Sequence, residues 1–94
     1  MRLRFHLDPE TDQPHIYDHG VTEEEVRQVM HGRGEDLRAA SGSRMKLGQT
    51  QAGRYLQVIY VPDPEPESVF VITAYELKGN ARRAYRRRQR RKGP

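Results

Sequence analysis

Alternation of hydrophobic and polar residues predicts several strands along this chain. In residues 2–6, Leu3 and Phe5 share one face, as in a short strand with one buried side. Residues 54–61 and 69–76 are longer segments rich in β-branched, aromatic and other apolar residues. Both are expected to be strands, because such side chains pack well on a pleated surface.

Less regular segments connect these strands. Residues 44–50 alternate and should form a strand, which a hairpin turn at 51–53 joins to the following one, and residues 37–40 are a weaker strand candidate. Segment 62–68 holds three prolines and three acidic residues. It cannot supply enough backbone donors for a strand and is expected to be an exposed acidic loop.

Three helices are predicted. Residues 13–19 should form a short helix that ends before Gly20. Thr22 and Glu25 have the spacing of a capping box at the start of a second helix, whose buried stripe is formed by Val26, Val29 and Met30. Residues 81–92 contain no glycine or proline and are rich in arginine, a good helix former, so they form the third helix.

The predicted order is therefore β-α-α-β-β-β-α, an α+β fold. Short turns between consecutive strands favour a mainly antiparallel sheet, with the two N-terminal helices on one face and the basic helix at its edge. The 94 residues fit one domain, which we divide into a body, residues 1–81, and a basic C-terminal helix and tail, residues 82–94.

Composition narrows the possible functions. There is no cysteine, which excludes disulfides and thiolate chemistry. No apolar run reaches the roughly 20 residues of a membrane-spanning helix, and the N-terminus lacks the apolar segment of a signal peptide, so a cytoplasmic location is expected. Residues 82–94 carry eight of the seventeen basic residues and no acid, whereas the rest of the chain has nine basic and thirteen acidic residues. The basic end suits nucleic-acid phosphates or an acidic protein partner.

Several segments, in the same order along nearly the whole chain, resemble the BrnT-like toxins of the RelE/ParE superfamily. Residues 15–22, HIYDHGVT, resemble the family's His-Gly-Val-Thr segment before a glutamate-rich helix, and residues 53–59, GRYLQVI, are similar to its Gly-Arg strand. Residues 71–75, VITAY, are similar to its last strand, and the arginine-rich end resembles its terminal helix. A related uncharacterised bacterial domain family ending in Thr-Ala-Tyr is closer still. The family's arginine in the last strand is Tyr75 here.

The resemblance implies a RelE-like fold and the function of a toxin in a type II toxin–antitoxin system. Such a toxin is a ribosome-independent endoribonuclease that cleaves RNA without a metal or other cofactor, and a cognate antitoxin protein neutralises it. His19 matches the family's His-Gly position, and Arg54 matches its Gly-Arg position.

RNA cleavage by attack of the ribose 2′-OH needs a base, an acid and a cation that stabilises the phosphorane. His19 is the candidate base; alternatively it only binds carbonyls at a helix end. Arg54 is the candidate cation; alternatively it pairs with an acidic side chain. Thr73 and Tyr75 should share the open face of a strand, where Tyr75 could act as the acid or stack on a base, or the two could simply pack across strands. The residues expected on the opposite, core face of that strand are Phe70, Ile72 and Ala74.

A second set of residues could hold the nucleic-acid backbone. His15 shares a helical face with His19, and Lys78 follows the last strand. The arginines proposed for phosphate contact are Arg82, Arg83, Arg86 and Arg87. A zinc site at His15 and His19 lacks an evident third ligand, so no metal is predicted, and His6 and His31 receive no role.

Two other functions compete with the nuclease. A non-catalytic RNA- or DNA-binding module on the same fold would bind through its basic helix, and the four candidate catalytic residues would be scattered or bonded into the structure. An interaction domain would use the basic tail to meet an acidic protein. An endoribonuclease predicts instead that the four residues converge on one concave face.

Overall fold

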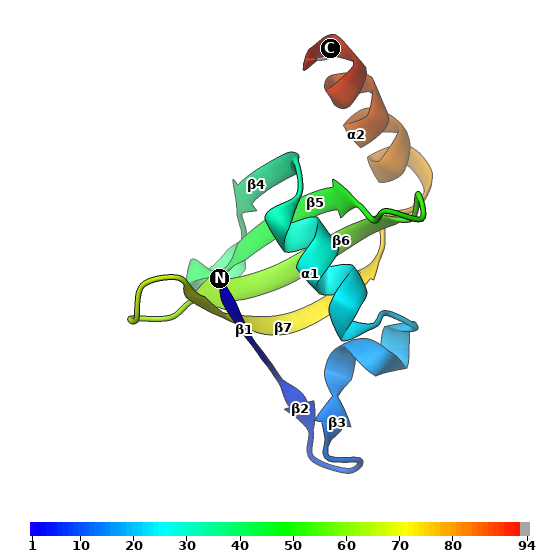
Figure 1. Cartoon of the computed structure of the whole chain (residues 1–94). Helices are drawn as coiled ribbons and strands as arrows, with labels where there is room; N and C mark the ends of the chain where they lie inside the picture. The colour runs from blue at the N-terminus through cyan, green and yellow to red at the C-terminus, as the bar shows by residue number, and fades with distance from the viewer. Residues whose placement is uncertain (93–94) are drawn as a thin grey trace.

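A five-stranded mixed sheet forms the centre of the computed structural model, which describes residues 1–92 (Figure 1). The sheet order is β1-β7-β6-β5-β4. The strands, in that order, are Arg2–Phe5, Ser68–Glu76, Tyr55–Pro62, Arg44–Gln49 and Gly34–Arg38. Neighbouring strands among the last four are antiparallel, whereas β1 lies at the edge of the sheet and is parallel to β7. The prediction of strands at 2–6, 44–50, 54–61 and 69–76 is confirmed, and the weak candidate at 37–40 is observed slightly earlier as β4.

The predicted pair of N-terminal helices is wrong, and with it the predicted β-α-α-β-β-β-α order and RelE-like arrangement. Residues 7–14 form a small hairpin of β2 (Leu7–Asp8) and β3 (Gln13–Pro14), followed by the 3₁₀ helix η1 (His15–His19). Pro14 is extended, with φ −52° and ψ 131°, and Gly20 already adopts φ 68°. The five residues between them allow a single tight helical segment rather than an α-helix that could cover a sheet face.

The predicted capping box starts the helix α1 (Glu23–His31). Thr22 Oγ1 accepts a hydrogen bond from the Glu25 amide at 3.1 Å, and the Glu25 carboxylate accepts one from the Thr22 amide at 3.0 Å. The helix packs its buried side on β5 and β6. A Cβ added to Gly48 would lie 3.0 Å from Val29 Cγ1, so glycine permits this close approach of helix and sheet. The core between them includes Ile16, Val26, Val29, Leu56, Val58, Val71 and Ala74.

A β-bulge changes which residues of β7 face this core. Thr73 pairs with Ile59, but Val71 pairs with the next residue, Tyr60, so Ile72 has no partner across the strand pair. The alternation is therefore reversed beyond the bulge. Ala74 faces the core as predicted, whereas the predictions for Phe70 and Ile72 are wrong. The core residues before the bulge are Val69 and Val71.

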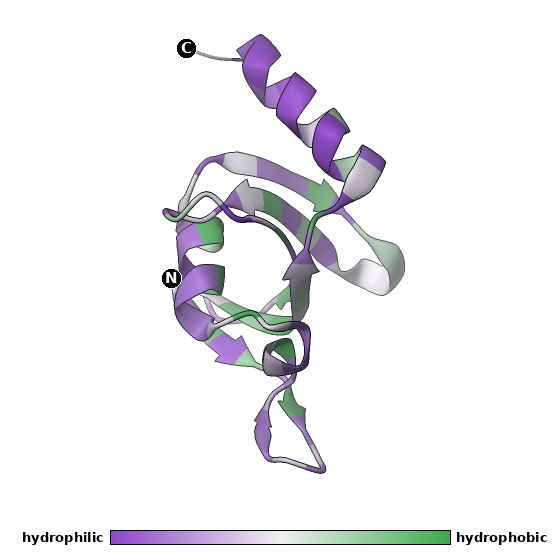
Figure 2. Ribbon diagram, turned by 90° about the vertical axis from the view of Figure 1, so that its right-hand side faces the viewer, coloured by the Kyte–Doolittle hydropathy of each residue, from purple (hydrophilic) through white to green (hydrophobic). Residues whose placement is uncertain are grey.

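The C-terminal helix α2 (Gly79–Lys92) contacts the opposite side of the sheet from α1 and extends away from it (Figures 1 and 2). Tyr85 is its one buried residue and packs with Leu47 and Leu77. Arg88 adds a bidentate ion pair to Glu35, at 2.6 and 2.7 Å. Residues 93 and 94 of the predicted tail lie outside the described residues. None of the described helices is long and apolar enough to cross a membrane.

Candidate active site

Three of the four predicted catalytic residues meet at one surface cleft of about 530 Å³. His19 enters from the end of η1, Arg54 from the residue directly before β6 and Tyr75 from near the end of β7. The cleft also contains Lys78, predicted as a phosphate contact, and two acidic residues, Asp18 and Glu76. The convergence arises because η1 docks on β7 and the antiparallel β6 and β7 bring their adjacent ends together.

His19 and Tyr75 lie next to each other in this cleft. Their ring centroids are 5.6 Å apart, and both side chains are exposed. Gln57 Nε2 donates a hydrogen bond to the Tyr75 hydroxyl oxygen at 3.1 Å. Because that oxygen is the acceptor, the hydroxyl proton of Tyr75 is free to be donated to a bound substrate.

The two rings continue a row of aromatic side chains. His15 lies 5.3 Å from His19, and His6 lies 6.1 Å from His15 and 6.2 Å from Phe70, between ring centroids. His6, which received no role from the sequence, reaches this row because β1 places it beside β7, where its amide donates to the Val71 carbonyl. The pairing of β1 with β7 adds His6 and Phe70 to the local pair of His15 and His19.

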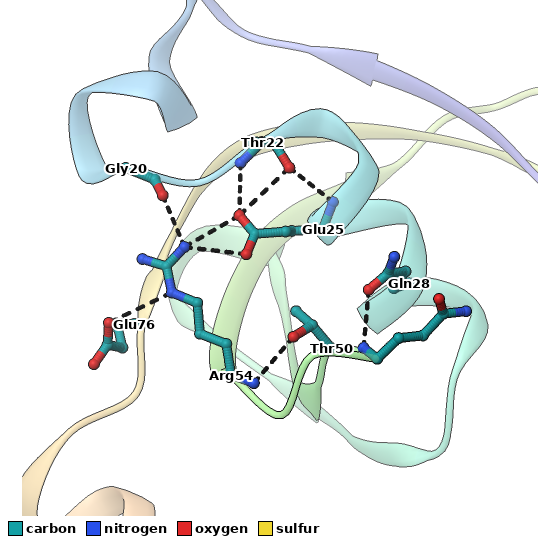
Figure 3. Close-up of polar contacts among 8 residues, drawn as sticks. Gly20, Thr22, Glu25, Gln28, Thr50, Arg54 and Glu76 are labelled. Carbon is teal, nitrogen blue, oxygen red and sulfur yellow. Dashed lines mark hydrogen bonds and ion pairs between the residues drawn. The ribbon is translucent and has the colours of Figure 1, made fainter.

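Arg54 is held by the structure on three sides (Figure 3). Its Nη1 donates to the Gly20 carbonyl at 2.7 Å and to the Glu25 carboxylate at 3.1 and 3.2 Å, and its Nε donates to Glu76 at 3.4 Å. Desolvation raises the pKa of Glu25, but hydrogen bonds from Thr22 and Arg54 outweigh it and leave the pKa lowered. The alternative predicted for Arg54, pairing with acidic residues, therefore occurs. Its Nη2 makes no hydrogen bond within residues 1–92 and points away from Glu25 (Figure 3).

The cleft is close to electrically neutral. Arg54 and Lys78 oppose Asp18 and Glu76. Lys78 is exposed and makes no ion pair with any residue in the described part of the chain. Lys78 is therefore the cation of this cleft most available to a phosphate.

Thr73 does not reach the cleft. Its hydroxyl is buried and has no hydrogen-bond partner among residues 1–92. Thr73 and Tyr75 lie on the same face of β7, as predicted, but only Tyr75 lines the cleft. A buried hydroxyl without a partner is unfavourable and cannot contact a substrate at the cleft.

His15 has partners that the sequence did not reveal. Its Nδ1 lies 3.5 Å from Asp18 Oδ2, and one ligand atom each of Asp8, His15 and Asp18 fall within 4.8 Å of one another. Such nitrogen and carboxylate donors could hold a divalent cation. The histidine pair considered from the sequence is thus replaced by a group that excludes His19. Asp8 was missed because the β2–β3 hairpin, which brings it back beside His15, was not predicted.

The predicted phosphate-binding arginines all lie on α2, away from this cleft. Arg82, Arg83, Arg86 and Arg87 are exposed there. Arg83 donates to the Asn80 side chain, and Arg86 lies over the Tyr55 ring, 5.8 Å from its centroid. The sequence missed two cleft residues, Asp18 and Glu76, although each is the chain neighbour of a residue that it did identify. Comparison with models of protein families, with curated proteins and with solved structures finds no match for this chain.

Proposed function

We propose that this protein is a metal-independent endoribonuclease that acts as the toxin of a toxin–antitoxin pair. The observation that supports this most is the cleft where His19, Tyr75 and Lys78 meet beside the free Nη2 of Arg54. Acid–base groups and cations around one open space are what cleavage by a ribose 2′-OH requires. The order of sequence motifs resembling BrnT-like toxins points to the same activity and to a cognate antitoxin as protein partner.

In the proposed reaction, the His19 imidazole accepts the proton of the ribose 2′-OH as that oxygen attacks the phosphorus. Lys78 and Arg54 Nη2 stabilise the negative charge of the phosphorane. The bond to the 5′-oxygen then breaks, and Tyr75 donates its hydroxyl proton to that leaving oxygen. The Gln57 amide, which already donates to Tyr75, stabilises the resulting phenolate. The products are a 2′,3′-cyclic phosphate and a 5′-hydroxyl end.

A second candidate function is a non-catalytic RNA- or DNA-binding module. The observation that favours it is the saturation of Arg54 by Gly20, Glu25 and Glu76, which leaves one nitrogen of its guanidinium for a substrate. In that function the basic α2 would provide the affinity.

Incubation of purified protein with RNA in EDTA distinguishes the two functions. We expect cleavage to persist in EDTA and to yield cyclic phosphate ends. It should fall by about 10²–10⁴-fold in His19→Ala and in Tyr75→Phe, the usual contribution of a general acid or base. His31→Ala removes an exposed histidine outside the cleft and should cleave like the wild type. RNA binding without any cleavage would refute the nuclease and favour the binding module.

A further inference from the structure

A pocket of about 510 Å³ lies between α2 and the sheet, separate from the candidate active site. Three arginines reach it: Arg33 from the turn after α1, and Arg86 and Arg90 from successive turns of α2. Two tyrosines and two glutamines complete its lining, and it contains no carboxylate. Its volume falls within the range of roughly 300–1,000 Å³ typical of small-ligand sites.

The three arginines have no ion-pair partner in the described part of the chain, although the Glu35 carboxylate lies beside the same helix. Glu35 is engaged by Arg88, and that bond lowers the pKa of the Glu35 carboxyl. Arg33, Arg86 and Arg90 make no ion pair within residues 1–92. Arg88 thus anchors the helix, while the other guanidinium groups gather around an open space without compensating acids. Such a group attracts an anion, and arginine matches the geometry of a phosphate.

The pocket also offers planar surfaces and an unused amide. The half-buried Tyr55 ring lies edge-to-face against Tyr85, with centroids 6.1 Å apart, and Arg86 lies above it. Aromatic rings and guanidinium planes are the surfaces on which unpaired bases stack. The side-chain nitrogen of Gln89 is buried and has no hydrogen-bond partner in the described structure. Because Gln89 lines the pocket, a rotation of its side chain would bring this nitrogen to a ligand acceptor there.

We propose that this pocket binds a nucleotide of single-stranded RNA, with its phosphate at the three arginines and its base against Tyr55 and Arg86. An acidic peptide would satisfy the charges, but it would not use the planar surfaces. Tyr55 lines the pocket and its chain neighbour Arg54 lines the cleft, so the two sites share the start of β6. An RNA strand bound in the pocket is therefore expected to continue toward the cleft. The choice of RNA as the ligand rests on the proposed nuclease function.

The test compares two double variants that each remove two positive charges. Arg33→Ala/Arg90→Ala removes charges from the pocket, and Arg91→Ala/Lys92→Ala removes two exposed charges of α2 outside it. Binding to a short fluorescent RNA is followed by anisotropy over a range of salt concentrations. All its riboses are 2′-O-methylated, so that it cannot be cleaved. Thermal melting verifies that both variants are folded.

Each phosphate contact on a single strand contributes about 0.7 to the slope of log affinity against log salt. Because the pocket is proposed to hold one phosphate, the pocket pair should lower the slope by about 0.7, equivalent to roughly 5-fold weaker binding at about 0.1 M salt relative to a 1 M reference. The control pair should change the slope much less. Equal losses in both variants would overturn the proposal and leave only diffuse attraction by α2. Stronger competition by polyglutamate than by unlabelled RNA would also overturn it, in favour of an acidic protein.

Cleavage of unmodified RNA, measured in parallel, separates this inference from the proposed function. Pocket-dependent RNA binding without cleavage would refute the nuclease and retain the binding site. Cleavage by the wild type, together with unchanged RNA binding in Arg33→Ala/Arg90→Ala, would support the nuclease and refute the binding site in the pocket.

Discussion

Replacement of Arg54 by alanine is the sharpest test of how the cleft is built. The guanidinium joins the end of η1 to the start of α1 and to β7, through Gly20, Glu25 and Glu76. Its removal leaves the Gly20 carbonyl without this donor and the Glu25 carboxylate with the hydrogen bonds from Thr22 alone. We therefore expect Arg54→Ala to lose stability as well as activity.

The expected loss can be estimated from these contacts. Hydrogen bonds to charged groups contribute about 1.5–3 kcal/mol each when buried. The side chains of Arg54 and Glu25 are 29% and 23% exposed, so the lower part of that range applies, and the 3.4 Å pair with Glu76 adds at most about 1 kcal/mol. A loss of about 2–3 kcal/mol follows, which lowers the melting temperature of a domain this small by about 10–20 °C.

The assay is thermal and urea unfolding followed by circular dichroism, with Arg87→Ala as the control. Arg87 is exposed and makes no ion pair within residues 1–92, so its removal should change stability by less than about 0.5 kcal/mol. Cleavage is then measured well below the melting temperature of each variant. An Arg54→Ala protein as stable as the control would refute the structural role assigned to these contacts.

Three other changes test particular features of the fold. Thr73→Val removes a buried hydroxyl without a partner, so melting should show a gain of about 1 kcal/mol with cleavage unchanged; lost cleavage at equal stability would make Thr73 catalytic after all. The pKa of Asp63 is lowered from 3.8 to about 2 by hydrogen bonds from Arg4 and Ser68. The stabilising effect of Asp63 is therefore complete above pH 3.8 and is lost as the pH falls toward 2. In Asp63→Asn the urea-unfolding midpoint should depend less on pH over that range, and a dependence equal to that of the wild type would contradict this. Tyr85→Ala should cost about 3–5 kcal/mol and free α2, which hydrogen exchange would detect as lost protection confined to residues 79–92; retained protection there would show that Tyr85 is not its anchor.

Local signals in the sequence predicted local structure well. The Thr22–Glu25 capping box and the apolar strands β6 and β7 are formed by neighbours in the chain, and both occur where the pattern places them. The segment 13–19 failed because its few residues between Pro14 and Gly20 form one 3₁₀ helix, and length, rather than propensity, decided the outcome. The parallel pairing of β1 with β7 joins distant segments and leaves no turn motif to reveal it.

The candidate site was predictable in its members but not in its environment. His19 and Arg54 were identified because they match the His-Gly and Gly-Arg positions of the toxins that the sequence resembles, and Tyr75 from its place on the last strand. Their partners depend on tertiary contacts: Glu25 reaches Arg54 from another element, and the β-bulge at Ile72 alters the facing of β7. No periodicity in the sequence indicates how these segments are packed together.

The parallel pairing of β1 with β7 also determines when the cleft can form during synthesis. Arg2–Phe5 pairs with Ser68–Val71, so the first strand cannot pair until residues 68–71 have left the ribosome. Closing so long a loop is entropically costly and makes folding dependent on non-local contacts. His19 can approach Tyr75 only once η1 has docked on the finished β7. A nascent chain would therefore lack the assembled cleft until the segment that contains Tyr75 and Lys78 has been made and paired.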